Sequence, residues 1–425
     1  MTIVKAAVLR QKEYWMGWPG AAFPVDRYEK EYARKAVELG RSAGVEIDFL
    51  HPIMDHDGLD DFVSEISSSP PHGVLLILLS MNSWGMVDEI LELGLPTVVF
   101  APIGTAFTGH IVERSRRKGV WIVSSLEMDQ VARALRVIDV KTKLSQEKML
   151  VFKGDSQPKE EKIKGLGITV LTLPRDEVVR AYESVEGGPE VDSFVDEYLQ
   201  SASSIVEPSR EDIFKAGRMY VACKALVDRY GATAITMDCL GLVGSKMIDT
   251  TPCLAFSKLN DEAIPAACEA DMDALLTMIL VKHLYGRPCF MNDPVPETVH
   301  NLLVAAHCTS PTTLGGYQSR RESFVLRSHS ESGIGVSIGV RWREGQRITL
   351  AKFQGAGRML VGSGTVVGNI DTPPAGGCRT SVLVAMDQVK DVRDVKGFHQ
   401  LLIYGDLRQD LERSCQLLGI ETQPM

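Results

Sequence analysis

Residues 267–294 read ACEADMDALLTMILVKHLYGRPCFMNDP and contain the pattern that decides the fold, a helix followed at once by a strand. Apolar side chains recur at helical spacing behind a cluster of acids, which predicts a helix over residues 269–285. Gly286 and Pro288 end this helix. The apolar segment 289–292 predicts a buried strand, and Asp293 falls where that strand gives way to a loop.

Two acids of this stretch, Glu269 and Asp293, lie at the ends of their predicted elements. A helix with a return strand can bring them together, and this is the geometry of a metal site. Each acid also has a simpler interpretation, because first-turn acids usually stabilise the helix end and an aspartate before a proline is usually a turn residue. We give Asp271 and Asp273 the simpler interpretation, as capping or dipole partners.

The composition is typical of a globular protein with several domains. The chain has 425 residues, of which 44% are hydrophobic and 24% charged, and this length predicts two to four domains. A net charge of −9 argues against nucleic acid as a partner, since phosphate binding needs a concentrated basic surface. We expect no signal peptide and no membrane span, because the longest apolar run, residues 74–79, is too short. Eight cysteines without a Cys-x-x-Cys pair indicate reduced, mostly buried thiols and a cytoplasmic location.

Residues 1–143 alternate apolar runs with amphipathic segments, which predicts a Rossmann-like, doubly wound α/β domain. The predicted strands are residues 3–9, 46–50, 73–79, 97–101 and 120–124. The predicted helices are residues 26–43, 59–67, 84–93, 104–118 and 127–138. The polar segment 141–147 marks the boundary, and the absence of a G-x-G-x-x-G motif after the first strand argues against a dinucleotide.

Residues 144–298 predict a second Rossmann-like α/β domain. Its predicted strands are residues 149–153, 168–173, 233–237 and 289–292. Its predicted helices are residues 157–165, 177–185, 191–202, 210–229 and 269–285. Asp238 follows a predicted strand, which makes it a candidate for the same crevice as Glu269.

Residues 299–425 predict a β-rich, antiparallel, barrel-like domain that closes with a helix. Short β-branched runs separated by glycines lie at residues 332–343, 347–353, 357–360, 365–370 and 381–386, and the helix is expected at 407–418. We interpret the glycine-rich segments 355–357 and 362–364 as turns, since neither has the helix that a phosphate loop needs.

Two histidines of this region stand at the ends of apolar runs, His307 after one run and His399 before another. Side chains at strand ends can point into a shared cleft. Two carboxylates and two imidazoles form a ligand set suited to Mn²⁺ or another divalent ion. A lone histidine beside apolar residues is more often a hydrogen-bonded core residue, so these positions alone do not decide between the two interpretations.

Sequence motifs favour the metal site. Residues 268–278 and 288–293 resemble the metal-site segment of the L-fucose isomerase and L-arabinose isomerase superfamily. Four further segments match in the same order, at residues 306–311, 328–333, 397–399 and 404–406. With the two α/β domains, the resemblance covers nearly the whole chain.

The resemblance implies a role for individual residues. Glu269 and Asp293 match the two acids that hold the metal and move protons in this superfamily. His399 matches the distal histidine ligand of the fucose isomerases, and His307 matches an additional ligand of the arabinose branch. His329 matches a histidine near the sugar. Aspartate at position 293, where the arabinose branch has glutamate, places the site nearer the fucose type.

The resemblance also implies an assembly. The first domain resembles a lid over the site of a neighbouring subunit, in which an aromatic residue stacks on the sugar. Trp15 and Trp18, just after the first strand, are the candidates, although a loop anchored in the core explains them equally well. The expected partner is the protein itself, as a trimer or hexamer with the site near a subunit interface.

The reaction implied is aldose–ketose interconversion of a free sugar through an ene-diol, with Glu269 and Asp293 as the acid–base pair. Two alternatives stay open: a non-catalytic sugar-binding or regulatory protein of this fold, and a metal-dependent sugar epimerase or lyase. The complete acid pair with His399 favours an enzyme, because a binding module does not need two proton-moving carboxylates.

The sequence does not name the sugar, which is fucose-like, arabinose-like or a modified aldose. Arg320, Arg321 and Arg327 precede the 328–333 segment, and an anionic substituent could pair with them. Solvated charge is the simpler interpretation of these arginines.

Overall fold

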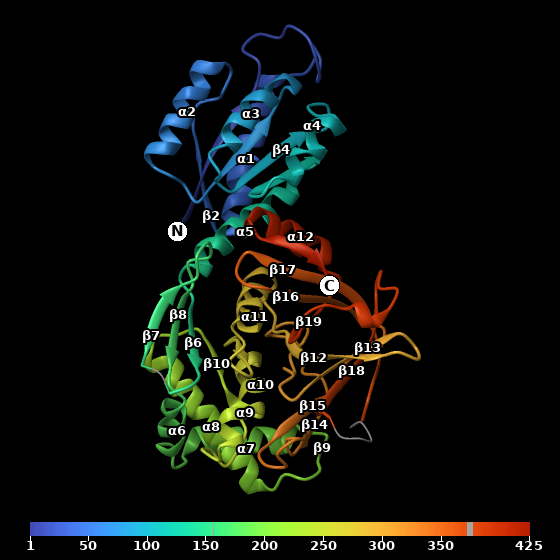
Figure 1. The fold of residues 1–425 in the computed structure, drawn as a ribbon. Coiled ribbons are helices and arrows are strands. Elements are labelled where there is room, and N and C mark those ends of the chain that lie inside the picture. The colour runs from blue at the N-terminus through green and yellow to red at the C-terminus, as the bar shows by residue number, and fades with distance from the viewer. Residues whose placement is uncertain (156, 372–376) are drawn as a thin grey trace. The chain divides into compact units, whose positions relative to one another are not determined.

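The computed structural model describes residues 1–155, 157–371 and 377–425 and divides the chain into two compact units. The first unit comprises Met1–Lys143 with Asp410–Thr422, and the second comprises Leu144–Gln409 with Gln423–Met425. The final helix, predicted with the β-rich region, therefore groups mainly with the first unit. The segments predicted as central and C-terminal domains together form the second unit (Figure 1).

The first unit contains a five-stranded parallel sheet in the order β2-β1-β3-β4-β5, which confirms the doubly wound α/β prediction. Its strands are β1 (Thr2–Leu9), β2 (Val45–Phe49), β3 (Gly73–Leu78), β4 (Thr97–Pro102) and β5 (Val120–Ser125). Its helices are α1 (Val25–Ala43), η1 (Met81–Ser83), α2 (His56–Ser68), α3 (Trp84–Leu91), α4 (Thr108–Val112), η2 (Arg114–Arg116), α5 (Asp129–Leu144) and α12 (Arg408–Leu417). All side chains of β3 and β4 are buried, as expected for strands covered on both faces.

Two predictions in the first unit were wrong in extent. The helix expected at 104–118 is reduced to α4 and the 3₁₀ turn η2, neither of which buries a residue. Without an apolar face to pack, a longer helix has no tertiary support. Helix α5 continues through part of the polar segment 141–147 because Val140 and Leu144 are buried on its inner face.

The second unit begins with a sheet in the order β11-β10-β6-β8-β7, parallel except for β7. Its strands are β6 (Lys148–Phe152), β7 (Lys159–Lys162), β8 (Thr169–Leu173), β10 (Ala234–Met237) and β11 (Ala266–Ala267). Its helices are α6 (Asp176–Glu183), α7 (Pro189–Ser201), α8 (Arg210–Arg229), α9 (Cys239–Gly244), α10 (Cys253–Asp261) and α11 (Met272–Tyr285). The helix predicted at 157–165 is wrong, because the exposed segment Lys159–Lys162 lacks an apolar face and pairs with β8 as a hairpin.

A six-stranded antiparallel barrel follows, which confirms the β-rich prediction. Its strands are β12 (Phe290–Glu297), β13 (Leu302–His307), β16 (Arg347–Phe353), β17 (Arg358–Asn369), β18 (Thr380–Met386) and β19 (Gln400–Tyr404). They run in the order β16-β19-β12-β13-β18-β17, and pairing of β17 with β16 closes the barrel. Smaller elements are β9 (Ser204–Ile205), β14 (Phe324–Arg327), β15 (Ser337–Val340), η3 (Val392–Asp394) and β20 (Glu421–Pro424).

Strand β12 corrects the prediction for the central stretch. It belongs to the barrel rather than to the second α/β sheet, and it continues through Asp293 instead of ending there. Pro294 and Pro296 suggest a break in the sequence, but proline favours extended backbone in the residue before it, and β12 pairs with β13 from Asp293 to Glu297.

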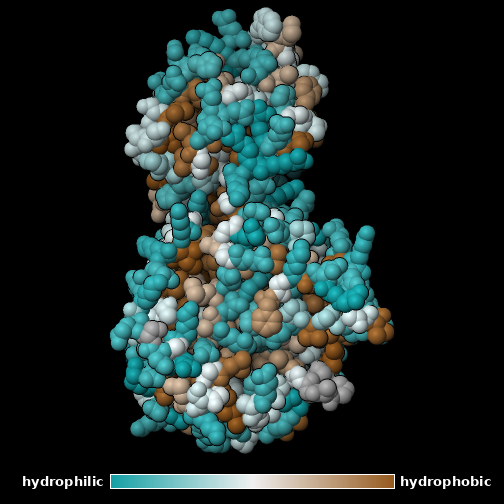
Figure 2. Space-filling model, in the orientation of Figure 1, coloured by the Kyte–Doolittle hydropathy of each residue, from teal (hydrophilic) through white to brown (hydrophobic). Residues whose placement is uncertain are grey.

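Strand β17 corrects a second prediction, since residues 362–364 lie inside the strand and are not a turn. A Cβ on Gly364 would lie 2.7 Å from the Ala385 carbonyl oxygen, so glycine permits close approach of β17 and β18. All eight cysteines are free and seven are buried, as predicted. Among the described residues, no helix is long and apolar enough to cross a membrane. The visible face of each unit is largely hydrophilic with smaller apolar patches (Figure 2).

Candidate functional site

Glu269 lies in the turn between β11 and α11, on strained backbone. Its φ is 61° and that of Ala270 is 53°, a left-handed conformation that costs a non-glycine residue about 1–3 kcal/mol. The turn is held on both sides, because Ala270 N–H donates to the Met237 carbonyl at 2.9 Å and Asp271 N–H donates to that of Cys268 at 3.1 Å. These bonds fix the backbone that carries the Glu269 carboxylate.

Helix α11 begins at Met272, so Glu269 precedes the helix rather than lying in its first turn. Asp271 is the N-cap and accepts a hydrogen bond from Ala274 N–H at 2.7 Å, which confirms the capping interpretation of that residue. Asp273 lies in the first turn and accepts from Gly355 N–H at 3.1 Å.

The barrel supplies two imidazoles. His307 is the last residue of β13, is only 5% exposed, and has Nδ1 3.2 Å from Thr309 Oγ1. His399 directly precedes β19, is 4% exposed, and also has a left-handed backbone with φ of 53°. Two of the site residues, Glu269 and His399, are therefore held in costly backbone conformations, which is common where geometry serves function.

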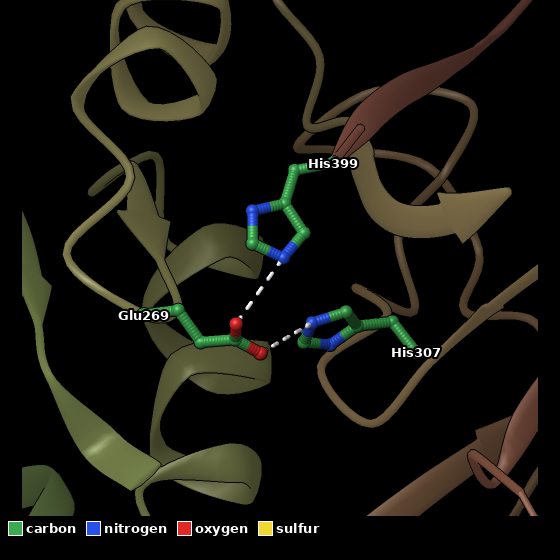
Figure 3. Close-up of side chains that lie close together, drawn as sticks. All are labelled: Glu269, His307 and His399. Atoms are coloured by element: carbon green, nitrogen blue, oxygen red, sulfur yellow. Dashed lines mark ion pairs between the residues drawn. The ribbon is translucent and has the colours of Figure 1, made fainter. Parts of the chain in front are cut away.

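Glu269, His307 and His399 converge (Figure 3). Their candidate ligand atoms all lie within 4.8 Å of one another. Glu269 Oε2 is 3.4 Å from His399 Nε2, and Glu269 Oε1 is 3.8 Å from His307 Nε2. Asp293 joins from β12, with Oδ1 3.3 Å from the same His399 Nε2. The four residues expected as ligands thus lie in one cluster of the second unit.

The unpaired atoms of this cluster fit a divalent cation. Asp293 Oδ1 and His399 Nε2 are both buried and have no hydrogen-bond partner in the structure. A buried polar atom without a partner is costly, and a bound cation would satisfy both atoms. Carboxylate oxygens and imidazole nitrogens are suited to Mn²⁺, Zn²⁺, Fe²⁺ and similar ions, and the donor set does not select one of them.

On its Nδ1 side His399 contacts Asp271, which in turn contacts Lys352, and neither contact was predicted from the sequence. His399 Nδ1 is 2.8 Å from Asp271 Oδ2, and Lys352 Nζ donates to the same oxygen at 2.6 Å. Asp271 was interpreted only as a cap. The sequence signal for Lys352 is a lysine near the end of the otherwise apolar part of β16, where a charged side chain needs a buried partner.

The charges of the site follow from contacts and burial. The contact with His399 lowers the pKa of Glu269, whereas burial raises the pKa of Asp293 to about 6. Burial alone would lower the pKa of His399, but the hydrogen bond to Asp271 and the nearby Glu269 carboxylate raise it to about 9. Burial lowers the pKa of His307 to about 4. In the metal-free protein at neutral pH, His399 is therefore cationic and His307 is neutral.

Asp238 and His329 have structural contacts of their own. Asp238 follows β10, accepts from Gly241 N–H at 2.9 Å as the N-cap of α9, and pairs with Arg175 at 3.3 Å. His329 is 9% exposed, with Nδ1 2.9 Å from Ser332 Oγ. These contacts explain Asp238 as a cap and hold His329 within its own turn.

The two tryptophans lie in the first unit. Trp15 is 79% exposed and Trp18 is 53% exposed. The ring of Trp18 lies 5.1 Å from that of Phe107 and lines a cavity of about 200 Å³ behind β1. Neither ring is buried, but the loop that carries them is tied to the unit, since Asn82 Nδ2 donates to the Met16 carbonyl at 2.9 Å and Met81 N–H donates to that of Trp18 at 3.2 Å, so both interpretations stand.

Two of the three arginines that precede residues 328–333 are already neutralised. Arg321 pairs with Glu197, and Arg327 pairs with Glu207 at 2.5 Å. Arg320 is exposed. Arg320 fits the solvated interpretation, whereas Arg321 and Arg327 are held in ion pairs and are not simply solvated.

The sequence is related to a curated sugar isomerase. It is 28% identical over 186 residues to a sulfoquinovose isomerase from Clostridium sp. (strain MSTE9), a match that covers 41% of this chain and 40% of that protein. The chain is therefore a distant homologue of that enzyme, with the match spanning less than half of its length. No family model matches the sequence.

Solved structures give only weak likenesses. One is a LacI family regulator, CCPA, from Weissella paramesenteroides with bound sucrose, at 15% identity, 55% coverage of this chain, 78% of that chain and a TM-score of 0.19. Another is an ABC transporter substrate-binding protein from Sphaerobacter thermophilus, at 12% identity, 92% and 98% coverage and a TM-score of 0.21. TM-scores this low carry no argument about this protein.

We predict that affinity for a divalent metal rises with pH. A proton on His399 (pKa about 9) or on Asp293 (pKa about 6) competes with a cation for the same atom, so binding strengthens as pH rises through both values. Titration calorimetry with Mn²⁺ at pH 7, in buffers of different ionisation enthalpy, should detect about one proton released per ion, from His399. Affinity that does not change with pH would contradict the assignment of His399.

Proposed function

We propose that this protein is a metal-dependent aldose–ketose isomerase of a free sugar. The observation that carries the proposal is the approach of Glu269 and Asp293 to the same nitrogen of His399, from an α/β turn and a barrel strand respectively. Distant homology to a sulfoquinovose isomerase supports the reaction class. Glu269, His307, His399 and Asp293 would hold the ion, for which Mn²⁺ is our choice.

The bound ion would polarise the sugar carbonyl and acidify the carbon-bound hydrogen beside it. The two carboxylates divide the remaining work according to their environments. Glu269, whose pKa is lowered, remains charged and is suited to hold the ion. Asp293, the other carboxylate at the same nitrogen of His399, is then the group that accepts and returns a proton.

The proton transfers of this isomerisation need no side chain beyond the two carboxylates, Glu269 and Asp293. Asp293 takes the proton from carbon 2 of the aldose, which leaves an ene-diolate, and returns it to carbon 1. The hydroxyl proton on oxygen 2 moves to oxygen 1 in the same conversion, so aldose and ketose have the same composition and no redox partner is needed. His329 would face the sugar from beside His307.

We choose the candidate sugar from the homologue and base the proposed assembly on the exposed tryptophans of the first unit. A sulfonated hexose is our first candidate substrate, because the homologue is a sulfoquinovose isomerase. The exposed rings of Trp15 and Trp18 are suited to stack on a sugar held by a neighbouring subunit in a homo-oligomer. Reduced thiols are compatible with the cytoplasmic location that we expect.

The alternative is a sugar-binding protein of the same fold that does not turn over its ligand, or an epimerase or lyase that uses the same ene-diol. Product analysis separates these possibilities, since only an isomerase converts an aldose to its ketose at constant mass.

Purified protein, stripped of metal and then supplied with Mn²⁺, should convert at least one sugar of a panel to the ketose. The panel contains sulfoquinovose, L-fucose, D-arabinose and L-arabinose, and products are identified by chromatography and mass spectrometry. Chelation should abolish conversion. Binding of a sugar without any ketose would favour the non-catalytic sugar-binding protein. An epimeric aldose or a cleaved product would favour the epimerase or lyase.

Glu269→Gln and Asp293→Asn should each retain the fold and lose turnover by at least about 10²–10⁴-fold, because the first removes a charged ligand of the ion and the second removes the group that moves the proton. Asp273→Asn is the matched control, because Asp273 belongs to the same segment but accepts its hydrogen bond from Gly355 N–H. Circular dichroism checks folding. A near-normal rate in either site variant would remove that residue from the mechanism.

A further inference from the structure

The carboxylate of Asp271 is fully engaged on the side of His399 away from the metal cluster. Its Oδ2 contacts His399 Nδ1 at 2.8 Å and accepts from Lys352 Nζ at 2.6 Å, while Oδ1 accepts from Ala274 N–H at 2.7 Å. A carboxylate with three such partners is not available as a ligand. Asp271 is therefore tied to the imidazole and to an ammonium group at once.

Lys352 is an unusual residue for its position. Its side chain is only 7% exposed, on a strand whose other residues from Ile348 to Phe353 are buried. Its stem lies under the turn that leads to His399, because a Cβ on Gly397 would be 3.9 Å from Lys352 Cγ. A buried ammonium is costly unless it is paired, and Asp271 is the carboxylate that pairs with it.

The charged groups around the His399 imidazole form two sets, one at each ring nitrogen. Three carboxylates, those of Glu269, Asp271 and Asp293, contact His399. Lys352 balances Asp271 on the Nδ1 side. The two remaining negative charges, on Glu269 and Asp293, lie on the Nε2 side and match the charge of a divalent cation.

We propose that Lys352 and Asp271 form a positioning pair that holds His399 with Nδ1 protonated and Nε2 directed at the cation, and that Lys352 acts through Asp271. The pair rests on the proposed function, since it serves the metal site of that reaction. Partners that orient a ligating histidine typically change metal affinity by about 10–100-fold when they are removed.

The geometry argues against one other role, and measurement separates a second. Lys352 is not placed to contact a sugar, since its ammonium is buried against Asp271 and away from the Nε2 side of the ring. A purely structural link between β16 and α11 would be expected to affect folding but not the affinity of the folded protein for metal. Metal affinity, measured apart from folding, therefore distinguishes positioning from packing.

The test is a double-mutant cycle on Mn²⁺ affinity in the full-length, metal-stripped protein, measured by titration calorimetry. Lys352→Met and Asp271→Asn should each weaken Mn²⁺ binding by about 10–100-fold. If Lys352 acts through Asp271, the double variant should bind no more weakly than Asp271→Asn alone. Lys352→Arg should restore most of the affinity, because it keeps the charge.

Lys282→Met is the matched control, since Lys282 lies on α11 but faces Glu147 at 3.6 Å, outside the cluster. It should bind Mn²⁺ as the wild type does. Unchanged affinity in folded Lys352→Met, or effects of the two variants that add, would overturn the positioning pair alone. Failure of the wild type to bind any divalent ion would overturn the proposed function and the pair with it.

Discussion

The site depends on a difference in charge and hydrogen bonding between the two ring nitrogens of His399. One ring nitrogen contacts Asp271 and is satisfied, while the other lies between two carboxylates and has no hydrogen-bond partner. In the metal-free protein burial acts to lower the pKa of His399, but the contact with Asp271 and the two carboxylates at the other nitrogen raise it to about 9, so a proton partly balances the negative charge. A divalent cation would balance it better, because it would also satisfy the buried oxygen of Asp293.

Neither half of the second unit makes this cluster alone. The α/β sheet contributes Glu269 and Asp271 from a strained turn, and the barrel contributes His307, Asp293 and His399. The position of Glu269 relative to the imidazoles is thus set by how α11 packs on the barrel, where Phe353 N–H donates to the Thr277 hydroxyl at 3.0 Å. Substitutions at that packing surface are expected to act on the site indirectly.

The sequence predicted the fold class and the metal cluster but not the details that position them. Hydrophobic periodicity identified the strands of the first sheet and helix α8, since these elements bury continuous apolar faces. It failed at residues 157–165, where a hairpin strand has no apolar face, and at Asp293, where two prolines lie within a strand. Glu269, His307 and His399 stand at the ends of predicted elements and match the superfamily motifs, whereas the pairing of Lys352 with Asp271 spans 81 residues of sequence and no local pattern encodes it.

The most direct measurement is anomalous diffraction from crystals of the full-length protein grown with Mn²⁺. One strong anomalous peak is expected, bonded to Glu269, His307, His399 Nε2 and Asp293, with Asp271 still hydrogen-bonded to His399 Nδ1. A peak bonded to Asp271, a peak elsewhere in the chain, or no peak at saturating Mn²⁺ would contradict this expectation.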